Sequence, residues 1–453
     1  MMPVFHRPLT PLRLLFRLSP ATVLALGAVL ASGPPAPPPG GIDWPQWRGG
    51  QRDGIWREAG LIEKFPGATI ALRWSVPIGA GYSGPTVATG RVYVMDFTKE
   101  KSAERVLCLD WRTGAQLWEV SYPCSYSGFT YEAGPRASVT VHDGRAYALG
   151  AAGHLHCLEA ATGRVLWQRD LRAEYRIRMP KWGIAAHPLV AGEVVITQIG
   201  GAGEACVVAF DRLTGAERWK AFPDEASYSP PIALEQAGRR LVAMALGYRL
   251  VAFDPADGTL RWSHEQPKGS WPIAIPAPVV QGDLMFYCTA HAGSYLLRLA
   301  GDRPAVEVVW ERSRRAKSVD TLTPVIPDPL VMNGLVFGVQ TDGELRCLDL
   351  TTGRRLWETL EPMPKAWHAT MHLVRAGESG DRVWIFTEQG NLILARLNAE
   401  GYRELSRANL LAPTVEQGPR GRAVTWSHPA FAYRHIFARS DRELVCADLG
   451  AAP

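Results

Sequence analysis

One phrase recurs along this chain: an acidic residue, then Thr-Gly, then Trp. It runs from Asp110 to Trp118, Glu159 to Trp167, Asp211 to Trp219 and Asp349 to Trp357, with a weaker copy from Asp254 to Trp262. Trp74 and Trp310 continue the series of tryptophans, and Leu405 falls in the slot of an eighth. The step of roughly 47 residues is that of a four-stranded propeller blade. The repetition therefore predicts a ring of stacked repeats.

Each copy contains the signals of β-hairpins. Turn residues separate two short apolar runs at positions 87–93, 141–147, 279–285 and 331–337, which predicts a hairpin upstream of the phrase. Within the phrase, we expect Asp to bond the backbone two residues on and Gly to supply the positive φ of the third turn. The tryptophan then lies on the outermost strand and packs against the next blade. This structural docking role is predicted for Trp74, Trp118, Trp167, Trp219, Trp262, Trp310 and Trp357.

Counting the copies predicts eight blades. Seven are complete, from Gly84 to Trp118, Pro135 to Trp167, His187 to Trp219, Pro230 to Trp262, Pro276 to Trp310, Thr323 to Trp357 and Trp367 to Leu405. The eighth, from Trp426 to Leu449, has only three strands, and residues 71–76 around Trp74 supply its outer strand. That pairing closes the ring and hides its edges. The predicted fold is an all-β, eight-bladed propeller of four-stranded antiparallel blades, with seven blades as the nearest alternative.

The composition fits such a fold and argues against nucleic acid as a partner. Of 453 residues, 47% are hydrophobic and 21% charged, and 44 Gly and 35 Pro suit many short strands and turns. The net charge of +5 is spread over the whole length, and only residues 312–317 form a basic run. A nucleic-acid-binding protein usually shows a concentrated basic stripe.

The first residues indicate export. Arg7, Arg13 and Arg17 precede an apolar stretch at 21–31, followed by small residues and a proline tract. Residues 1–33 are predicted as a secretory signal peptide, with an uncleaved N-terminal anchor as the alternative. Residues 34–42 form a Pro-rich linker, 43–70 a segment before the propeller, and 71–450 the propeller. We expect an exported, monomeric protein of the periplasm or cell envelope that is not an integral membrane protein apart from such an anchor.

The seven cysteines point to packing rather than to disulfides. Cys108, Cys157, Cys347 and Cys446 occupy the same third-strand register in four different blades, so they cannot all be adjacent. Small apolar filling is their expected role. Cys124, Cys206 and Cys288 lie outside that register, and an odd total leaves at least one free thiol. No Cys-x-x-Cys-His, adjacent Cys pair or zinc-ligand spacing is present, so no metal site is expected.

The repeat resembles a known family. The pattern Asp-x-x-Thr-Gly-x-x-x-Trp is similar to the tryptophan-docking repeat of PQQ-like (quinoprotein-type) β-propellers, which include pyrroloquinoline-quinone dehydrogenases and BamB-type outer-membrane assembly proteins. Residues 43–54, Asp-Trp-Pro-Gln-Trp-Arg-Gly-Gly-Gln-Arg-Asp-Gly, look like the Trp-Pro-x-aromatic-Arg-Gly segment before the propeller of many exported bacterial members. The resemblance covers nearly everything from Asp43 to Asp448 and implies the scaffold rather than a function.

The family has an enzymatic and a non-catalytic branch. The resemblance implies that quinoprotein dehydrogenases need calcium beside the quinone, an Asp base, an aromatic floor and commonly a disulfide between adjacent cysteines. That cysteine pair is absent here, the chain is shorter, and no set of converging oxygens for a hard cation is evident. The prediction is therefore no cofactor and no catalytic residue, with PQQ plus calcium as the alternative.

A ligand-binding region follows from the propeller geometry. The loops that lead from an outer strand to the next inner strand end at the central channel, and here they are long and rich in aromatic residues. The predicted axial funnel contains Tyr82, Arg136, His187, Tyr228, Trp271, Thr323, His368, Trp426 and His428. Arg136 could clamp a carboxylate, or it could bond loop carbonyls. His187 and His428 could contact a ligand, or they could form their hydrogen bonds within the protein.

Three functions remain open on the sequence. The first is a non-catalytic binding or scaffold module for a protein, peptide or cell-envelope component, engaged through the loop face and funnel. The second is a PQQ-dependent alcohol or sugar oxidoreductase. The third is a small-ligand or carbohydrate-binding propeller that uses Trp182, Trp271, Trp367 and Trp426. No Ser-His-Asp order, phosphate loop or metal motif supports a hydrolase.

Overall fold

The computed structural model describes residues 1, 35–267, 273–313 and 321–451. The chain divides into two units, Met1–Pro34 and Pro35–Pro453, and the second holds every strand described below. The predicted signal peptide or anchor, apart from Met1, and Trp271 of the predicted funnel lie outside the described residues. Across the described ranges, no helix combines the length and the apolar character needed to cross a membrane.

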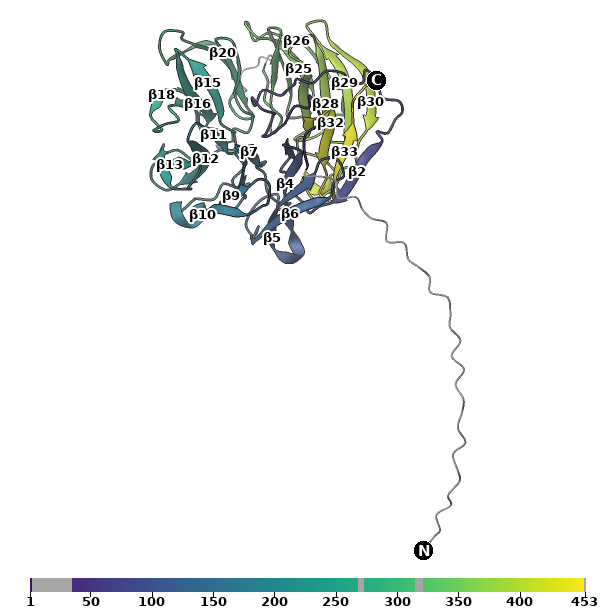
Figure 1. Cartoon of the computed structure of the whole chain (residues 1–453). Helices are drawn as coiled ribbons and strands as arrows, with labels where there is room; N and C mark the ends of the chain where they lie inside the picture. Colours follow the sequence, from purple (N-terminus) through teal and green to yellow (C-terminus); the bar gives the residue numbers. More distant parts are fainter. Residues whose placement is uncertain (2–34, 268–272, 314–320, 452–453) are drawn as a thin grey trace. The chain divides into compact units, whose positions relative to one another are not determined.

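The second unit is a ring of eight blades, each with four antiparallel strands, which confirms the predicted all-β, eight-bladed propeller (Figure 1). The first four blades comprise β3 (Thr86–Ala88), β4 (Arg91–Thr98), β5 (Ala103–Asp110), β6 (Gln116–Pro123); β7 (Thr140–His142), β8 (Arg145–Leu149), β9 (His154–Glu159), β10 (Val165–Asp170); β11 (Leu189–Ala191), β12 (Val194–Gly201), β13 (Ala205–Asp211), β14 (Glu217–Ala221); and β15 (Ile232–Gln236), β16 (Arg239–Ala245), β17 (Arg249–Phe253), β18 (Leu260–Glu265). The next three comprise β19 (Val279–Gln281), β20 (Leu284–Thr289), β21 (Gly293–Leu299), β22 (Val306–Ser313); β23 (Leu330–Met332), β24 (Leu335–Val339), β25 (Leu345–Asp349), β26 (Arg355–Thr359); and β27 (Met371–Ala376), β28 (Arg382–Thr387), β29 (Asn391–Leu397), β30 (Tyr402–Asn409). Helical structure in these ranges is confined to η1 (Lys99–Lys101), α1 (Leu171–Tyr175) and η2 (Pro419–Gly421).

The eighth blade closes the ring as predicted. It contains β31 (Ala430–Ala432), β32 (His435–Arg439) and β33 (Glu443–Asp448), and its outer strand is β2 (Leu72–Pro77) from the other end of the propeller sequence. β2 pairs antiparallel with β33, with Trp74 opposite Cys446. This pairing gives the last blade its fourth strand and joins the two ends of the propeller sequence in one sheet.

The recurring tryptophans connect neighbouring blades. The indole N–H of Trp118 donates to the carbonyl of Ala160 in the next blade at 3.1 Å. Its ring lies over Gly163, whose φ of +76° and lack of a side chain make room: a Cβ there would lie 2.7 Å from the ring. Trp74, Trp167, Trp219, Trp310 and Trp357 likewise donate to a carbonyl of the following blade, at 2.8 to 3.3 Å. Trp262 instead donates to the side-chain oxygen of Gln236. The amide nitrogen of Gln236 in turn donates to the carbonyl of Ala305 in the next blade.

The junction between the seventh and eighth blades departs from the sequence prediction. Ser406 pairs opposite Leu394 as Trp118 pairs opposite Cys108, so Ser406, and not Leu405, occupies the register of the missing tryptophan. The Ser406 hydroxyl accepts a hydrogen bond from the backbone N–H of Phe65 at 2.9 Å. The buried Phe65 ring packs in the core cluster at this junction. The segment before the propeller thus fills the space that an indole fills elsewhere.

That segment is part of the propeller rather than a separate lead-in. Trp44 bridges Val87 of the first blade, and β1 (Ile55–Trp56) adds a parallel fifth strand to β27 of the seventh. Between them, Arg52 is buried and donates to the carbonyls of His187, Pro188 and Pro231 in the third and fourth blades. Residues 44–56 therefore run across the inner strands, where a propeller has its axis.

Candidate functional site

The loops before the inner strands enclose a cavity of about 150 Å³ on the propeller axis. Its walls are mainly aromatic and histidine side chains contributed by different blades. The lining residues are Trp47, Tyr82, Tyr131, Arg136, Trp182, Ala185, His187, Tyr228, Pro230, Ile275, Val325, Ile326, Asp328, His368, His372, Trp426 and His428. Aromatic walls with few polar groups are typical of ligand pockets.

The structure gathers most of the predicted funnel residues around this one cavity. Tyr82, Arg136, His187, Tyr228, His368, Trp426 and His428 all line it. Thr323 does not; its backbone N–H and hydroxyl instead contact the Gln340 side chain at 2.6 and 3.2 Å. Trp271 lies outside the described residues. Ligand binding by this set stays a prediction.

Trp47 lines the cavity and was not among the residues predicted from the sequence. It is 4% exposed and stacks on His187, with ring centroids 5.1 Å apart and planes 13° from parallel. The buried Arg52 anchors its segment to three backbone carbonyls, which holds the indole in place. The Trp-Pro-Gln-Trp motif was visible in the sequence, but its path into the channel depends on contacts with blades far along the chain.

The charged groups of the wall are already bonded within the protein. Arg136 donates to the loop carbonyls of Gly134, Thr130 and Tyr131, and its guanidinium lies 4.9 Å from the centroid of the Tyr82 ring. Of the two roles considered for Arg136, the structure shows the loop-carbonyl one. Asp328 accepts from the Ala277 N–H at 2.9 Å and faces Arg48 at 3.7 Å. Burial raises the pKa of Asp328 to about 6.

Three histidines of the cavity lining favour the neutral state; His187 is buried, and His372 and His428 are half-buried. Burial lowers the pKa of His372 to about 4 and holds the pKa values of His187 and His428 well below the ordinary range. His187 Nδ1 accepts from the Ser138 N–H at 2.7 Å, and the Trp426 carbonyl accepts from His372 Nε2 at 2.9 Å. His187 and His372 thus each have one ring nitrogen hydrogen-bonded within the protein, which for His187 is the structural role considered from the sequence.

Two enclosed polar atoms of the lining residues have no hydrogen-bond partner among the described residues. They are Nδ1 of His428 and Nε1 of Trp182. His428 uses its other nitrogen, Nε2, with the Ser138 hydroxyl at 3.0 Å. Buried polar groups in proteins are almost always hydrogen-bonded, so these two atoms are available to a ligand or to water.

An exposed tryptophan stands next to the cavity lining. The Trp367 side chain is 52% exposed, and its ring centroid lies 4.0 Å from that of the lining residue His368. The guanidinium of Arg420 lies 5.2 Å from the Trp367 ring, and Arg422 donates to the Trp367 carbonyl at 2.8 Å. A large aromatic surface held at this position is typical of a contact site for a partner.

The eight blades and the tryptophans that connect them define a propeller of PQQ-like repeats. A family model described as "Outer membrane protein assembly factor BamB" matches residues 102–359 and 302–451, and the chain belongs to this family.

Relatives with this description share little sequence with the chain. The outer membrane protein assembly factor BamB of Bordetella pertussis is 22% identical over 370 residues, covering 77% of this chain and 84% of the relative. That of Yersinia pestis is 21% identical over 290 residues, covering 60% and 67%.

Solved structures with the same fold include members of both branches. BamB from Moraxella catarrhalis aligns with a TM-score of 0.57 at 16% identity, covering 84% of this chain and 100% of that one. A europium-containing methanol dehydrogenase aligns with a TM-score of 0.66 at 12% identity, covering 88% and 90%. At such identities the likeness shows the fold alone.

The cavity does not fit a quinone with a hard metal ion. Calcium takes six to eight oxygen ligands, of which carboxylates are the usual source. Asp328 is the only carboxylate among the described residues that line the cavity, and it is already bonded to Ala277 and paired with Arg48. The other polar groups are imidazoles, indoles, phenols and a guanidinium, a poor donor set for such an ion.

Proposed function

We propose that this chain is an exported, non-catalytic propeller that binds a cell-envelope protein by accepting a neutral aromatic side chain of that partner in the axial cavity. The observation that carries the proposal is the cavity itself: its walls are aromatic and include Trp47, and its charged groups are already bonded within the protein. A carboxylate would compete with three loop carbonyls for Arg136, whereas an aromatic group would pack against several rings of the wall.

The unused polar atoms fit the same kind of ligand. Trp182 Nε1–H could donate to a phenol hydroxyl, and His428 Nδ1 could accept from a phenol hydroxyl or an indole N–H. Trp367 would then contact the partner outside the cavity, since it is exposed next to His368. Envelope location is supported by the signal-like first residues and by the description of the family.

A pair of small probes tests the chemistry of the cavity. We expect p-cresol, the tyrosine side chain, to quench tryptophan fluorescence saturably, and benzoate at the same concentration to have no such effect. Trp182→Ala should weaken p-cresol binding by about 1–3 kcal/mol, because it removes one wall and one hydrogen-bond donor. Equal binding of both probes, or p-cresol binding unchanged by Trp182→Ala, would contradict the proposal.

A position-specific crosslink tests the partner. We expect a photoreactive residue that replaces Trp367 to form a crosslinked adduct with an envelope protein in cells that produce this chain. Adding Trp182→Ala to the same chain should reduce the yield of that adduct. Leu213, which is 43% exposed on a turn of the third blade, serves as the control position. An adduct of equal yield from position 213 would argue against the cavity face as the contact site.

Two other results would favour the alternative functions. Dye reduction with PQQ and calcium would overturn the non-catalytic assignment, and quenching by sugars alone would favour the carbohydrate-binding alternative.

A further inference from the structure

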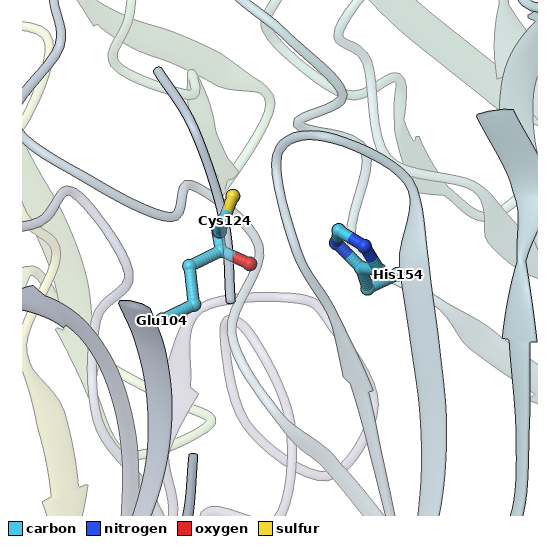
Figure 2. A group of neighbouring side chains, drawn as sticks. All are labelled: Glu104, Cys124 and His154. Atoms are coloured by element: carbon cyan, nitrogen blue, oxygen red, sulfur yellow. The ribbon is translucent and has the colours of Figure 1, made fainter. Parts of the chain in front are cut away.

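A second group of functional side chains lies away from the axial cavity, between the first and second blades. Glu104 is on β5, Cys124 follows the end of β6, and His154 begins β9 of the next blade. One donor atom from each residue lies within 4.8 Å of the other two. Figure 2 shows the Glu104 carboxylate and the Cys124 sulfur on one side, with an edge of the His154 ring facing them.

Glu104 is unusual because its carboxyl group is buried without a basic partner among the described residues. The side chain is 0% exposed, and no Lys, Arg or His among the described residues forms a salt bridge with it. Its oxygens accept from the Tyr122 hydroxyl at 2.7 Å, from the Tyr126 hydroxyl and from the Ala151 N–H at 3.1 Å. A carboxylate has about four acceptor positions, and the Cys124 thiol lies at the fourth. Buried charges in proteins are paired or coordinate metal ions.

His154 supplies an independent indication. Its Nδ1 is enclosed and has no hydrogen-bond partner among the described residues. The turn that carries it comes so close to the carboxylate that a Cβ on Gly150 would lie 2.0 Å from a Glu104 oxygen. An orphaned imidazole nitrogen, a thiol and a buried carboxylate therefore share one small space.

We propose that Glu104, Cys124 and His154 form a zinc site that joins the first two blades. Thiolate, imidazole and carboxylate are the three ligand types that Zn²⁺ takes in proteins, at about 2.0–2.3 Å. Tetrahedral ligand atoms at such bond lengths lie about 3.5 Å apart, so small side-chain rotations bring these donors to the required spacing. The thiol proton leaves to the buffer when the metal binds. Water completes the fourth position.

The neighbouring residues fit the surroundings of a metal site. Tyr122 and Tyr126 donate their hydroxyl hydrogens to the carboxylate, and metal ligands in other proteins are oriented by hydrogen bonds of this kind. The Tyr122 ring also stacks on His156, with centroids 4.4 Å apart. Two blades supply the ligands, so bound metal would add a crosslink to the Trp118 contact between the same blades.

Cobalt titration of the tag-free full chain tests the site. We expect one equivalent of Co²⁺ to bind with a near-ultraviolet sulfur-to-cobalt charge-transfer band, and Zn²⁺ to displace it and raise Tm. Cys124→Ser should abolish the band. His154→Gln and Glu104→Gln should each weaken cobalt binding by more than about 10-fold. Mutation of a residue that only hydrogen-bonds a metal ligand already weakens metal binding by about 10-fold or more, so loss of a ligand should cost at least as much.

The matched controls are a buried thiol and an exposed imidazole elsewhere. Cys206→Ser and His142→Gln should leave both the band and the Zn²⁺-induced Tm shift unchanged. His154→Gln tests binding with the least disturbance, since His154 is only half-buried, and circular dichroism verifies its fold. A missing charge-transfer band in the wild type, or equal cobalt binding in folded Cys124→Ser, would overturn the proposal.

Discussion

Replacing Trp118 with alanine is expected to lower the free energy of unfolding by about 3–5 kcal/mol, the usual cost of removing a large buried aromatic side chain. The ring is buried between the first two blades, its N–H reaches the Ala160 carbonyl at 3.1 Å, and it covers Gly163. A repeat ring depends on such interfaces because each blade contacts only its neighbours. Urea unfolding followed by far-UV circular dichroism measures the change.

Two further variants separate the causes. Trp118→Phe keeps an aromatic ring but removes the donor to Ala160, so it should cost less than Trp118→Ala. Trp367→Ala removes an indole of the same size that is 52% exposed, and it should change stability by no more than about 0.5 kcal/mol. Equal effects of Trp118→Ala and Trp367→Ala would show that the docking interpretation is wrong.

Acidification from about pH 7.5 to about pH 5 is expected to destabilise the protein, with His372 alone contributing about 2 kcal/mol of the loss. Its folded pKa of about 4 lies below the unfolded value of 6.5, so the unfolded chain binds the proton first as pH falls through this window. His187 and His428 act in the same direction because burial lowers their pKa values too.

Asp328 acts in the opposite direction. Its folded pKa of about 6 lies above the unfolded value, so the folded state takes up the proton first and gains about 1.4 kcal/mol over the same window. Urea midpoints at the two pH values measure the net loss. His372→Gln, whose amide can still donate to the Trp426 carbonyl, should remove about 2 kcal/mol of the pH dependence. A pH dependence unchanged by this variant would contradict the neutral state of His372.

Much of the axial cavity was accessible from the sequence because loop positions in a repeat fold are equivalent. Once Trp118 and its counterparts define the register of the blades, the repeat alone predicts that Tyr82, His187 and His428 lie at the channel. Trp47, Asp328 and His372 were missed. The first belongs to a segment that carries no repeat, and the other two have no residue pattern that distinguishes them from ordinary inner-strand positions.

The proposed zinc site could not be found from spacing. Glu104, Cys124 and His154 lie on two blades and three different segments, and no short motif joins them. Only the stacking of the second blade on the first brings the Gly150 turn against Glu104. The absence of a zinc motif in the sequence therefore says little about sites built across a blade interface.

The sequence alone determined the blade count, the closure by the strand around Trp74 and the docking role of the tryptophans, because each follows from periodicity and local turn chemistry. Tertiary structure decided what periodicity cannot express. Only the tertiary structure shows that Trp47 stacks on His187 and that Arg52 bonds the carbonyl of Pro231. It also shows that Phe65 bonds Ser406, where a tryptophan is missing, and that Arg136 donates to carbonyls of its own loop. Those outcomes depend on contacts between residues far apart in the chain, whose energies no local pattern records.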